Sequence, residues 1–255
     1  MRPIAAGRHG RAVYKYQHLL DSASFGQRNL TGDLVERLGH DIVGGRLKQE
    51  VTLPKEDDLA RRCGVSRTVV RDAMRMLAAK GLIETRTKRG TIVRNRREWS
   101  LLDPDVLRWT IASGNRPALL DDMIELRRIV EPAAAQLAAE RATRADLADI
   151  RRACEQMASS VLAEDDFLAA DIAFHQSVLR AAHNEGLASL SQAIKVALLA
   201  AFRRSMEIPD ATRTALPLHE AVCEAIHRRD AQSAAASMMK CVSQDTVEIR
   251  RKRRR

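Results

Sequence analysis

The chain has 255 residues, 45% of them hydrophobic, and 43 Lys and Arg against 33 Asp and Glu, a net charge of +10. This length and composition allow one large or two modest folded domains and exclude disorder of the whole chain. The most apolar run, 196–202, is far too short to cross a bilayer, and no apolar segment follows the basic N-terminus, so we expect neither a membrane span nor a secretory signal.

The charge is unevenly distributed along the chain. Residues 1–100 contain 21 basic and 11 acidic side chains, residues 101–249 contain 16 and 22, and residues 250–255 are all basic. This pattern predicts a module that binds a polyanion, joined to a body with another role and followed by a basic tail. The four cysteines form no CxxC pair, which is typical of reduced thiols and predicts a cytoplasmic protein; they are Cys63, Cys154, Cys223 and Cys241.

The first predicted elements form a small N-terminal domain over residues 29–93. Residues 1–28 have no periodicity and are expected to be a flexible extension. Leu34, Leu38 and Ile42 recur every four residues and predict a helix over 30–43. A short strand is expected over 47–53.

A helix, a tight turn and a second helix then follow. Pro54 suits the start of a helix over 55–63, and Gly64 begins the turn. Ser66 is a good N-cap for a helix that ends at Gly81. Loose alternation over 83–93 predicts two short strands around a basic turn, 87–90.

The rest of the chain predicts helix after helix. Residues 94–103 form a polar linker, and the absence of a convincing strand signal beyond it predicts an all-α domain over 104–249. The fold class is therefore mainly α, with the tail 250–255 outside it. Pro132 is expected to kink its helix. The predicted helices span 104–113, 117–141, 144–162, 164–183, 185–206, 214–228 and 230–250.

The helix that starts at Ser66 has the properties of a DNA-reading helix. Its polar face fits the major groove, where Arg can pair with guanine in a bidentate manner. The hairpin turn supplies a basic wing tip whose glycine allows close approach to a sugar-phosphate backbone. A merely solvated helix face is the alternative, but the turn, the hairpin and the basic head together favour double-stranded DNA as partner. The predicted contacts are Arg67, Thr68, Arg71, Arg75, Lys88, Arg89 and Gly90.

The body contains a second set of chemically suggestive residues. Asp171 and His175 are spaced i, i+4 and share one side of a helix. His219 and Cys241 add two more side chains that can bind zinc or another divalent ion. Taken singly, each residue also fits an ordinary role as a surface acid, a buried histidine or a small core residue. A metal-dependent enzyme would need a general base beside the site, for which Glu220 and Glu224 are the nearby candidates. Neither forms a hydrolytic motif such as HExxH, and an enzyme would leave the basic head unexplained, so we expect no enzyme.

Residues 30–93 resemble the winged helix-turn-helix of the GntR family. The resemblance implies DNA contact by Arg67, Thr68, Arg71 and Gly90. Some members have an arginine where this chain has Asp57, so a DNA contact is expected to be missing there. The motifs are Leu53-Pro54-Lys55-Glu56, Leu59-Ala60, Gly64 to Ala73, Leu77, Gly81-Leu82-Ile83 and Arg89 to Val93.

Residues 117–248 resemble the all-α effector domain of the FadR subfamily. In that subfamily an Asp and three histidines line a pocket that often binds a metal ion and a carboxylate effector. Asp171, His175 and His219 match, whereas Cys241 stands at the third histidine, which keeps a zinc ligand or marks the loss of the metal. The motifs are Glu125-Leu126-Arg127, Glu131-Pro132, Ala138 to Ala142, Asp171 to His175, His219 to Ala221, Ala225-Ile226 and Asp230-Ala231.

Arg127 has two predicted roles, as a fork for the effector carboxylate or as a salt-bridge partner of Glu131. The segment from Trp99 to Trp109 is similar to sugar-acid-responsive members of the subfamily. The resemblance therefore implies a homodimeric repressor of a sugar-acid operon that a small carboxylate releases from its operator. Regulation of another carboxylate pathway, such as that of a hydroxy acid, and activation in place of repression remain open.

Overall fold

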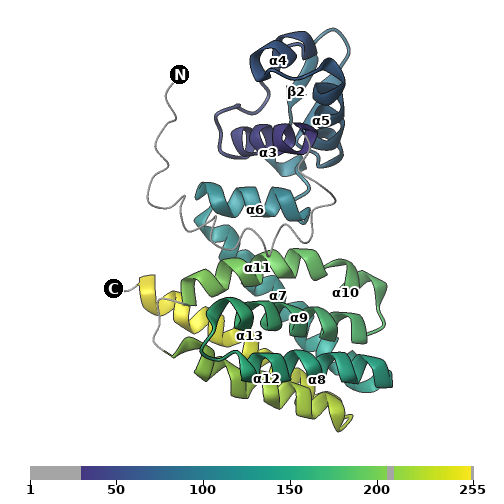
Figure 1. Ribbon diagram of the computed structural model, residues 1–255, viewed down its shortest axis with the longest axis vertical. Coiled ribbons are helices and arrows are strands. Elements are labelled where there is room, and N and C mark those ends of the chain that lie inside the picture. Colours follow the sequence, from purple (N-terminus) through teal and green to yellow (C-terminus); the bar gives the residue numbers. More distant parts are fainter. Residues whose placement is uncertain (1–29, 206–209, 254–255) are drawn as a thin grey trace. The chain divides into compact units, whose positions relative to one another are not determined.

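The computed structural model describes residues 30–205 and 210–253, which separate after Arg116 into two compact units (Figure 1). The predicted extension 1–28 and the last two residues of the basic tail lie outside the described residues. Each unit has its own packed core. The two are described separately.

The N-terminal unit is a helix-turn-helix followed by a two-stranded hairpin, as the sequence predicts. Buried aliphatic side chains from every helix meet in one core, with Val70, Ala73 and Leu77 of the second motif helix fully buried. The Ser66 hydroxyl accepts a hydrogen bond from the Val69 amide at 3.3 Å and so caps that helix. The elements are α3 (Leu30–Val43), α4 (Glu56–Cys63), α5 (Arg67–Ala79), β1 (Ile83–Arg86), β2 (Gly90–Val93), η1 (Arg96–Glu98) and α6 (Pro104–Ser113).

The hairpin forms the wing of the motif. β1 and β2 pair in antiparallel register, with Ile83 opposite Val93 and Arg86 opposite Gly90. The predicted strand over 47–53 is reduced to a single bridge from Thr52 to Ile92, although the Leu53 amide also donates to the Thr91 carbonyl at 2.8 Å. This short third segment covers the outer edge of β2.

Helix α6 packs in the N-terminal unit, whereas the sequence predicts residues 104–113 as part of the C-terminal domain. Trp109 is completely buried and packs against Gly39 of α3, where a Cβ atom would come within 2.4 Å of the indole ring. The guanidinium of Arg108 binds both carboxylate oxygens of Glu36, at 2.7 and 2.6 Å. These contacts with α3 place the boundary between the units after α6, at Arg116.

The C-terminal unit is a bundle of helices in which α7 and α13 share the most extensive contact (Figure 1). A stripe of buried alanines on α7, Ala134, Ala135, Ala138 and Ala139, lets neighbouring helices approach closely. No helix in the described ranges is long and apolar enough to cross a membrane. The helices are α7 (Pro117–Arg141), α8 (Arg144–Ser159), α9 (Glu164–Ala181), α10 (Glu185–Ser189), α11 (Ser191–Ser205), α12 (Ala211–His227) and α13 (Ala231–Arg253).

Several boundaries in this unit differ from those predicted: α8 ends at Ser159 rather than 162, and α12 begins at Ala211 rather than 214. The helix expected over 185–206 is broken at Leu190 into α10 and α11, and its start is capped by the Asn184 side chain, which accepts from the Leu187 amide at 3.1 Å. Helix α13 continues beyond 250, so part of the basic tail is helical in its backbone.

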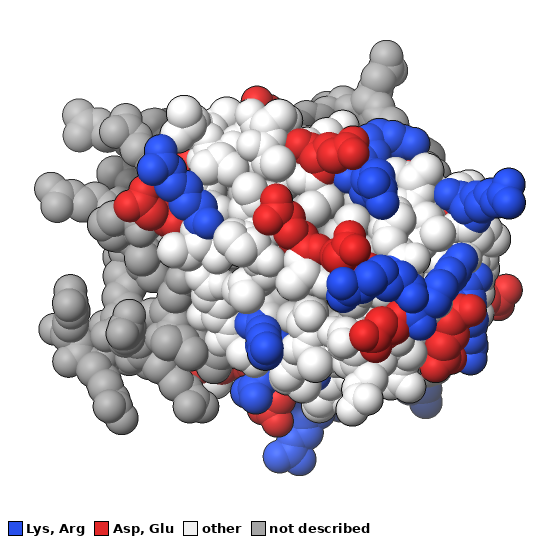
Figure 2. Space-filling model, turned by 90° about the horizontal axis from the view of Figure 1, so that it is seen from below, with Lys and Arg blue, Asp and Glu red and all other residues white. Residues whose placement is uncertain are grey.

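The described surface of the bundle mixes both signs of charge. Figure 2 shows the molecule from below, relative to the view of Figure 1, and acidic and basic side chains are interspersed there among wide uncharged areas. This is the surface expected of a body whose residues 101–249 have a net charge of only −6.

Candidate functional site

The predicted DNA-reading side chains all lie on the surface of the N-terminal unit. Arg67, Thr68, Arg71 and Arg75 are exposed on α5, while the opposite face of that helix is buried in the core. A helix with one apolar and one cationic face can insert the cationic face into the major groove without disturbing its packing.

Arg67, at the first position of α5, is held by a residue of the preceding helix. Its Nε lies 2.8 Å from Oδ1 of Asp57 on α4, and both side chains are more than half exposed. The acid of α4 therefore pairs with the first arginine of α5.

The wing tip adopts the tight turn that its sequence predicts. Lys88 and Gly90 both have positive φ, 65° and 79°, and Lys88, Arg89 and Gly90 are all exposed. Glycine at position 90 meets this backbone requirement without strain. The turn thus presents two cations and a bare stretch of backbone on the unit that carries the α5 arginines.

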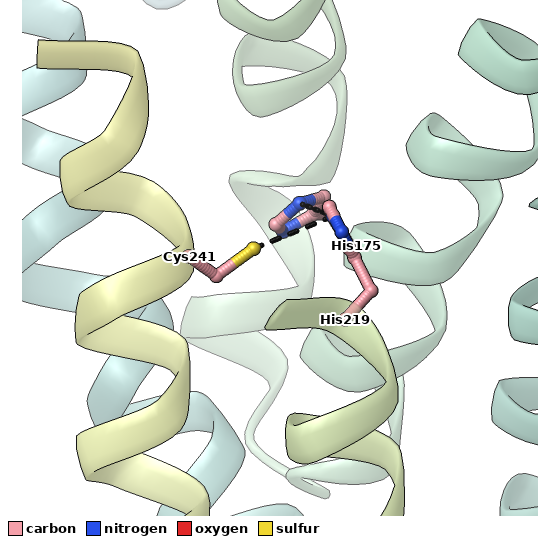
Figure 3. Close-up of side chains that lie close together, drawn as sticks. All are labelled: His175, His219 and Cys241. Carbon is pink, nitrogen blue, oxygen red and sulfur yellow. Dashed lines mark hydrogen bonds between the residues drawn. The ribbon is translucent and has the colours of Figure 1, made fainter. Parts of the chain in front are cut away.

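In the C-terminal unit, three of the predicted metal ligands converge from three helices (Figure 3). His175 of α9, His219 of α12 and Cys241 of α13 are buried, and one ligand atom from each lies within 4.8 Å of the other two. The two Nε2 atoms are 3.3 Å apart, and Cys241 Sγ is 3.4 Å from His219 Nε2. Asp171 completes the cluster, since its Oδ1 lies 3.4 Å from His175 Nε2 and 2.8 Å from His219 Nε2.

Both imidazoles are oriented by acceptors outside the cluster. His219 Nδ1 lies 2.9 Å from the Ala215 carbonyl, and His175 Nδ1 contacts the carboxylate of Glu131. An N–H at each Nδ1 leaves the Nε2 lone pair of a neutral ring facing the centre. Outer acceptors commonly orient metal-binding histidines in this way.

The donor spacing fits a tetrahedral ion. Zinc bonds of about 2.0–2.3 Å place neighbouring nitrogen, oxygen and sulfur donors roughly 3.3–3.6 Å apart. The distances from His219 to His175 and to Cys241, and from His175 to Asp171, match this spacing. The contact between Asp171 and His219 Nε2 is shorter, at 2.8 Å, and is a hydrogen bond when the ring carries a second proton at Nε2 in place of a bound ion.

The electrostatics of the cluster are those of tightly coupled opposite charges. Burial would lower the pKa of His219, but Cys241 and Asp171 outweigh it and raise the pKa to about 10. Although burial opposes it, hydrogen bonds from the two histidines hold the pKa of the Asp171 carboxyl well below its usual value. The cluster thus attracts positive charge, which either protons on the rings or a bound cation can supply.

A pocket opens beside this cluster and is lined by the predicted effector residues Arg127, Asp171, His175 and His219. The empty space of the pocket is about 550 Å³ when the solvent at its open mouth is included. Arg127 is 1% exposed and its Nε donates to Glu131 Oε1 at 2.6 Å, so the arginine both pairs with Glu131 and borders the pocket. Both roles predicted for it are compatible with this position.

Three polar residues of the site were not among the predicted site residues. Glu131 connects the pair with Arg127 to the ring of His175, and its spacing of i, i+4 from Arg127 was the available signal. Thr212 and Gln244 line the pocket, but nothing in the local sequence around them marks this role.

Comparison with known proteins matches both units. Residues 30–93 match the bacterial regulatory proteins of the gntR family, and residues 122–244 match the FCD domain. The solved structure of Lar, which controls expression of the Listeria monocytogenes agr system, aligns with a TM-score of 0.62 and 17% identity over 89% of this chain and 99% of that chain, and so supports the fold.

Two curated relatives extend over nearly the whole chain. The galactonate operon transcriptional repressor of Escherichia coli K12 is 36% identical over 87% of this chain and 97% of its own length. A putative L-lactate dehydrogenase operon regulatory protein of the same organism is 30% identical over 83% of each chain. The chain therefore belongs to the GntR family of DNA-binding transcriptional regulators, with a winged helix-turn-helix unit and an all-α FCD domain of the FadR type.

Proposed function

We propose that this regulator represses a sugar-acid catabolic operon and leaves its operator when a sugar acid binds to the FCD domain. The identity of 36% to a galactonate operon repressor, spanning 97% of that relative, is the observation that carries the proposal. The matched families and relatives are transcriptional regulators, so the metal-dependent enzyme considered from the sequence is set aside.

The pocket supports a carboxylate as effector. The nearly buried guanidinium of Arg127 borders a cavity that also contains Thr212 and Gln244. A guanidinium is suited to a carboxylate, and hydroxyl and amide groups are suited to the hydroxyls of a sugar acid.

A divalent ion held by Asp171, His175, His219 and Cys241 is the second part of the proposal. The donor spacing and the outer acceptors Glu131 and Ala215 support it. When bound, such an ion supplies a Lewis-acidic positive centre for a carboxylate oxygen. The protein residues hold the rings in place and exclude water behind them.

We further propose a homodimer that reads two half-sites. A two-fold regulator requires a near-palindromic operator, and effector binding changes operator affinity only if it favours one arrangement of the DNA-binding units over another. Sedimentation of the free protein and of its operator complex tests this point. One chain per operator in the complex would contradict it.

The effector class is tested by titrating acids into a complex of the protein with a labelled fragment of its own promoter. We expect galactonate or a related aldonate to release the DNA and to raise the melting temperature of the free protein, because a ligand that binds only the folded state stabilises it. L-lactate is the matched comparison, since one relative is assigned to an L-lactate operon. Release by L-lactate but by no aldonate would contradict a sugar-acid effector and would indicate a hydroxy acid instead.

The metal is tested on protein purified without chelator. We expect about one equivalent of a divalent ion per chain, unchanged in Cys63→Ala and reduced in Cys241→Ala. In protein loaded with cobalt, the sulfur-to-metal absorption should disappear in Cys241→His while the ion stays bound. If the effector releases DNA from metal-free protein as readily as from metal-loaded protein, the proposed role of the metal is contradicted.

A further inference from the structure

A second cluster of reactive side chains lies between α8 and α12, apart from the effector pocket. It consists of Arg151 and Cys154 on α8 and of Cys223 and His227 on α12. All four cysteines of the chain are free thiols. Neither Cys154 nor Cys223 lines the pocket, whose only cysteine is Cys241.

The register of the two helices brings the two thiols together. Arg151 Nε donates to His227 Nε2 at 3.1 Å, which fixes one turn of α8 against the last turn of α12. Cys154 lies three residues after Arg151, and Cys223 lies four residues before His227. One helical turn away from the Arg151–His227 contact, Cys154 and Cys223 therefore lie on the facing sides of α8 and α12.

The two thiols occupy different environments. Cys154 is 7% exposed, whereas Cys223 is only partly buried. The Nδ1–H of His227, which donates to the Cys223 carbonyl at 3.0 Å, also lies 3.7 Å from Cys223 Sγ. The neighbouring Cys154 thiol and the charge of Arg151 lower the pKa of Cys223, although burial opposes them. An accessible thiolate beside a protected thiol is the arrangement of an attacking and a resolving cysteine.

We propose that Cys223 and Cys154 form a peroxide-oxidisable thiol pair that closes a reversible disulfide between α8 and α12. The Cys223 thiolate attacks hydrogen peroxide, forming the sulfenic acid and releasing hydroxide. The Cys154 thiol then attacks the Cys223 sulfur, the S–S bond forms, and the sulfenic oxygen leaves as water with the thiol proton. Peroxide is the two-electron oxidant, and a dithiol reductant restores both thiols.

The position of this pair gives the disulfide a consequence within the bundle. Cys223 lies one helical turn after His219 on α12, so a bond to α8 would tether the helix that carries this pocket residue. The proposed disulfide requires neither a metal nor an effector, so its test can succeed or fail independently of the proposed function.

The test treats the full-length protein with hydrogen peroxide, blocks the remaining thiols and maps peptides by mass spectrometry without reduction. We expect a peptide pair joining Cys154 to Cys223, lighter by two hydrogen atoms than the separate peptides and lost on reduction. In Cys154→Ser, a sulfenic-acid trap should label Cys223 several times faster than Cys63, the half-buried cysteine of the other unit. In Cys63→Ser, the cross-link should form as in the wild type.

Three results would overturn the proposal. The first is wild-type protein in which no Cys154–Cys223 peptide forms while Cys63 is oxidised. The second is faster trapping at Cys63 than at Cys223. The third is a cross-link that pairs Cys223 with a cysteine of another chain. The wild-type map decides the question even if a serine variant does not fold.

Discussion

Arg67 is the predicted DNA-contacting residue at the first position of α5. It opens the recognition helix, and its partner Asp57 holds the guanidinium from the side of α4. An exposed ion pair of this kind contributes little to stability. Its effect is instead to restrict where the guanidinium points, which matters for a bidentate contact with a base.

Replacing Arg67 with Ala is expected to weaken binding to the specific operator by about 1–3 kcal/mol and to relax base preference at one position. Fluorescence anisotropy with operator and random duplexes measures both effects. Arg61→Ala is the matched control, because Arg61 is an exposed arginine of α4 that pairs with Asp58. Equal losses in the two variants would indicate a general charge effect and would contradict base reading by Arg67.

Glu131 is the buried residue on which the C-terminal pocket depends. Its carboxylate contacts both Arg127 and His175. Burial alone would raise the pKa of this carboxyl, but the two partners outweigh burial and lower the pKa to about 2. Glu131→Gln removes the buried carboxylate charge that Arg127 and His175 share. We expect a loss of about 3 kcal/mol in the free energy of unfolding.

Urea unfolding checks this expectation. Glu140→Gln, an exposed position on the same helix, serves as control and should change stability by less than about 0.5 kcal/mol. Similar midpoints for both variants would show that the buried ion pair does not stabilise the fold.

At the scale of elements, the contact between α3 and α6 organises the N-terminal unit. Glu36 lies between Arg108 and His40, and these partners hold its pKa well below the usual 4.5 although burial opposes them. A lowered carboxyl pKa contributes stability that is present above 4.5 and is lost as the pH falls through the native pKa.

Glu36→Gln should therefore destabilise the protein by about 1 kcal/mol at neutral pH, a modest value because Glu36 is more than one third exposed. The difference from wild type should shrink on acidification below 4.5. Urea unfolding over a pH series tests this, with the exposed Glu56→Gln as control. A difference that persists at low pH would assign the effect to packing rather than to charge.

The elements themselves were largely predictable, because caps and periodicity are local. Ser66, Asn184 and Thr143 each cap a helix where the sequence signals one. The break at Leu190 was not predictable, since neither glycine nor proline marks it. The placement of α6 also depended on a long-range contact, the fit of Trp109 against Gly39, that helix periodicity cannot reveal.

The candidate sites, too, were predictable where the signal is local and unpredictable where it depends on how distant helices pack. The i, i+4 pair Asp171 and His175 was visible in one helix, whereas His219 and Cys241 were candidates by side-chain type alone until the resemblance to a family connected them with that pair. Their convergence is a property of how α9, α12 and α13 pack. The link from Glu131 to His175 crosses from α7 to α9 and had no local signal.

At the scale of the whole molecule, the chain consists of two units with different charge and different tasks. Residues 30–116 should fold alone, because their core and the contact between α3 and α6 are complete within them. We expect this fragment to unfold cooperatively, and the fragment 30–93, which lacks Trp109, to be markedly less stable.

Trp109→Ala within the longer fragment is the matched comparison. It should cost about 3–5 kcal/mol, as expected for removing a fully buried large aromatic side chain. Thermal melts followed by circular dichroism measure both changes. Equal stability of the fragments 30–93 and 30–116 would contradict the role of α6.

The indole of Trp109 on Gly39 also bears on how regulators of this kind can exchange parts. A chimaera that joins this DNA-reading unit to a foreign sensor directly after the wing, at residue 93, would leave α3 without its cover and expose an apolar face. A crossover at residue 116 would transfer the covered unit whole. Recombination between such regulators, in the laboratory or in genomes, should therefore succeed more often at the later junction.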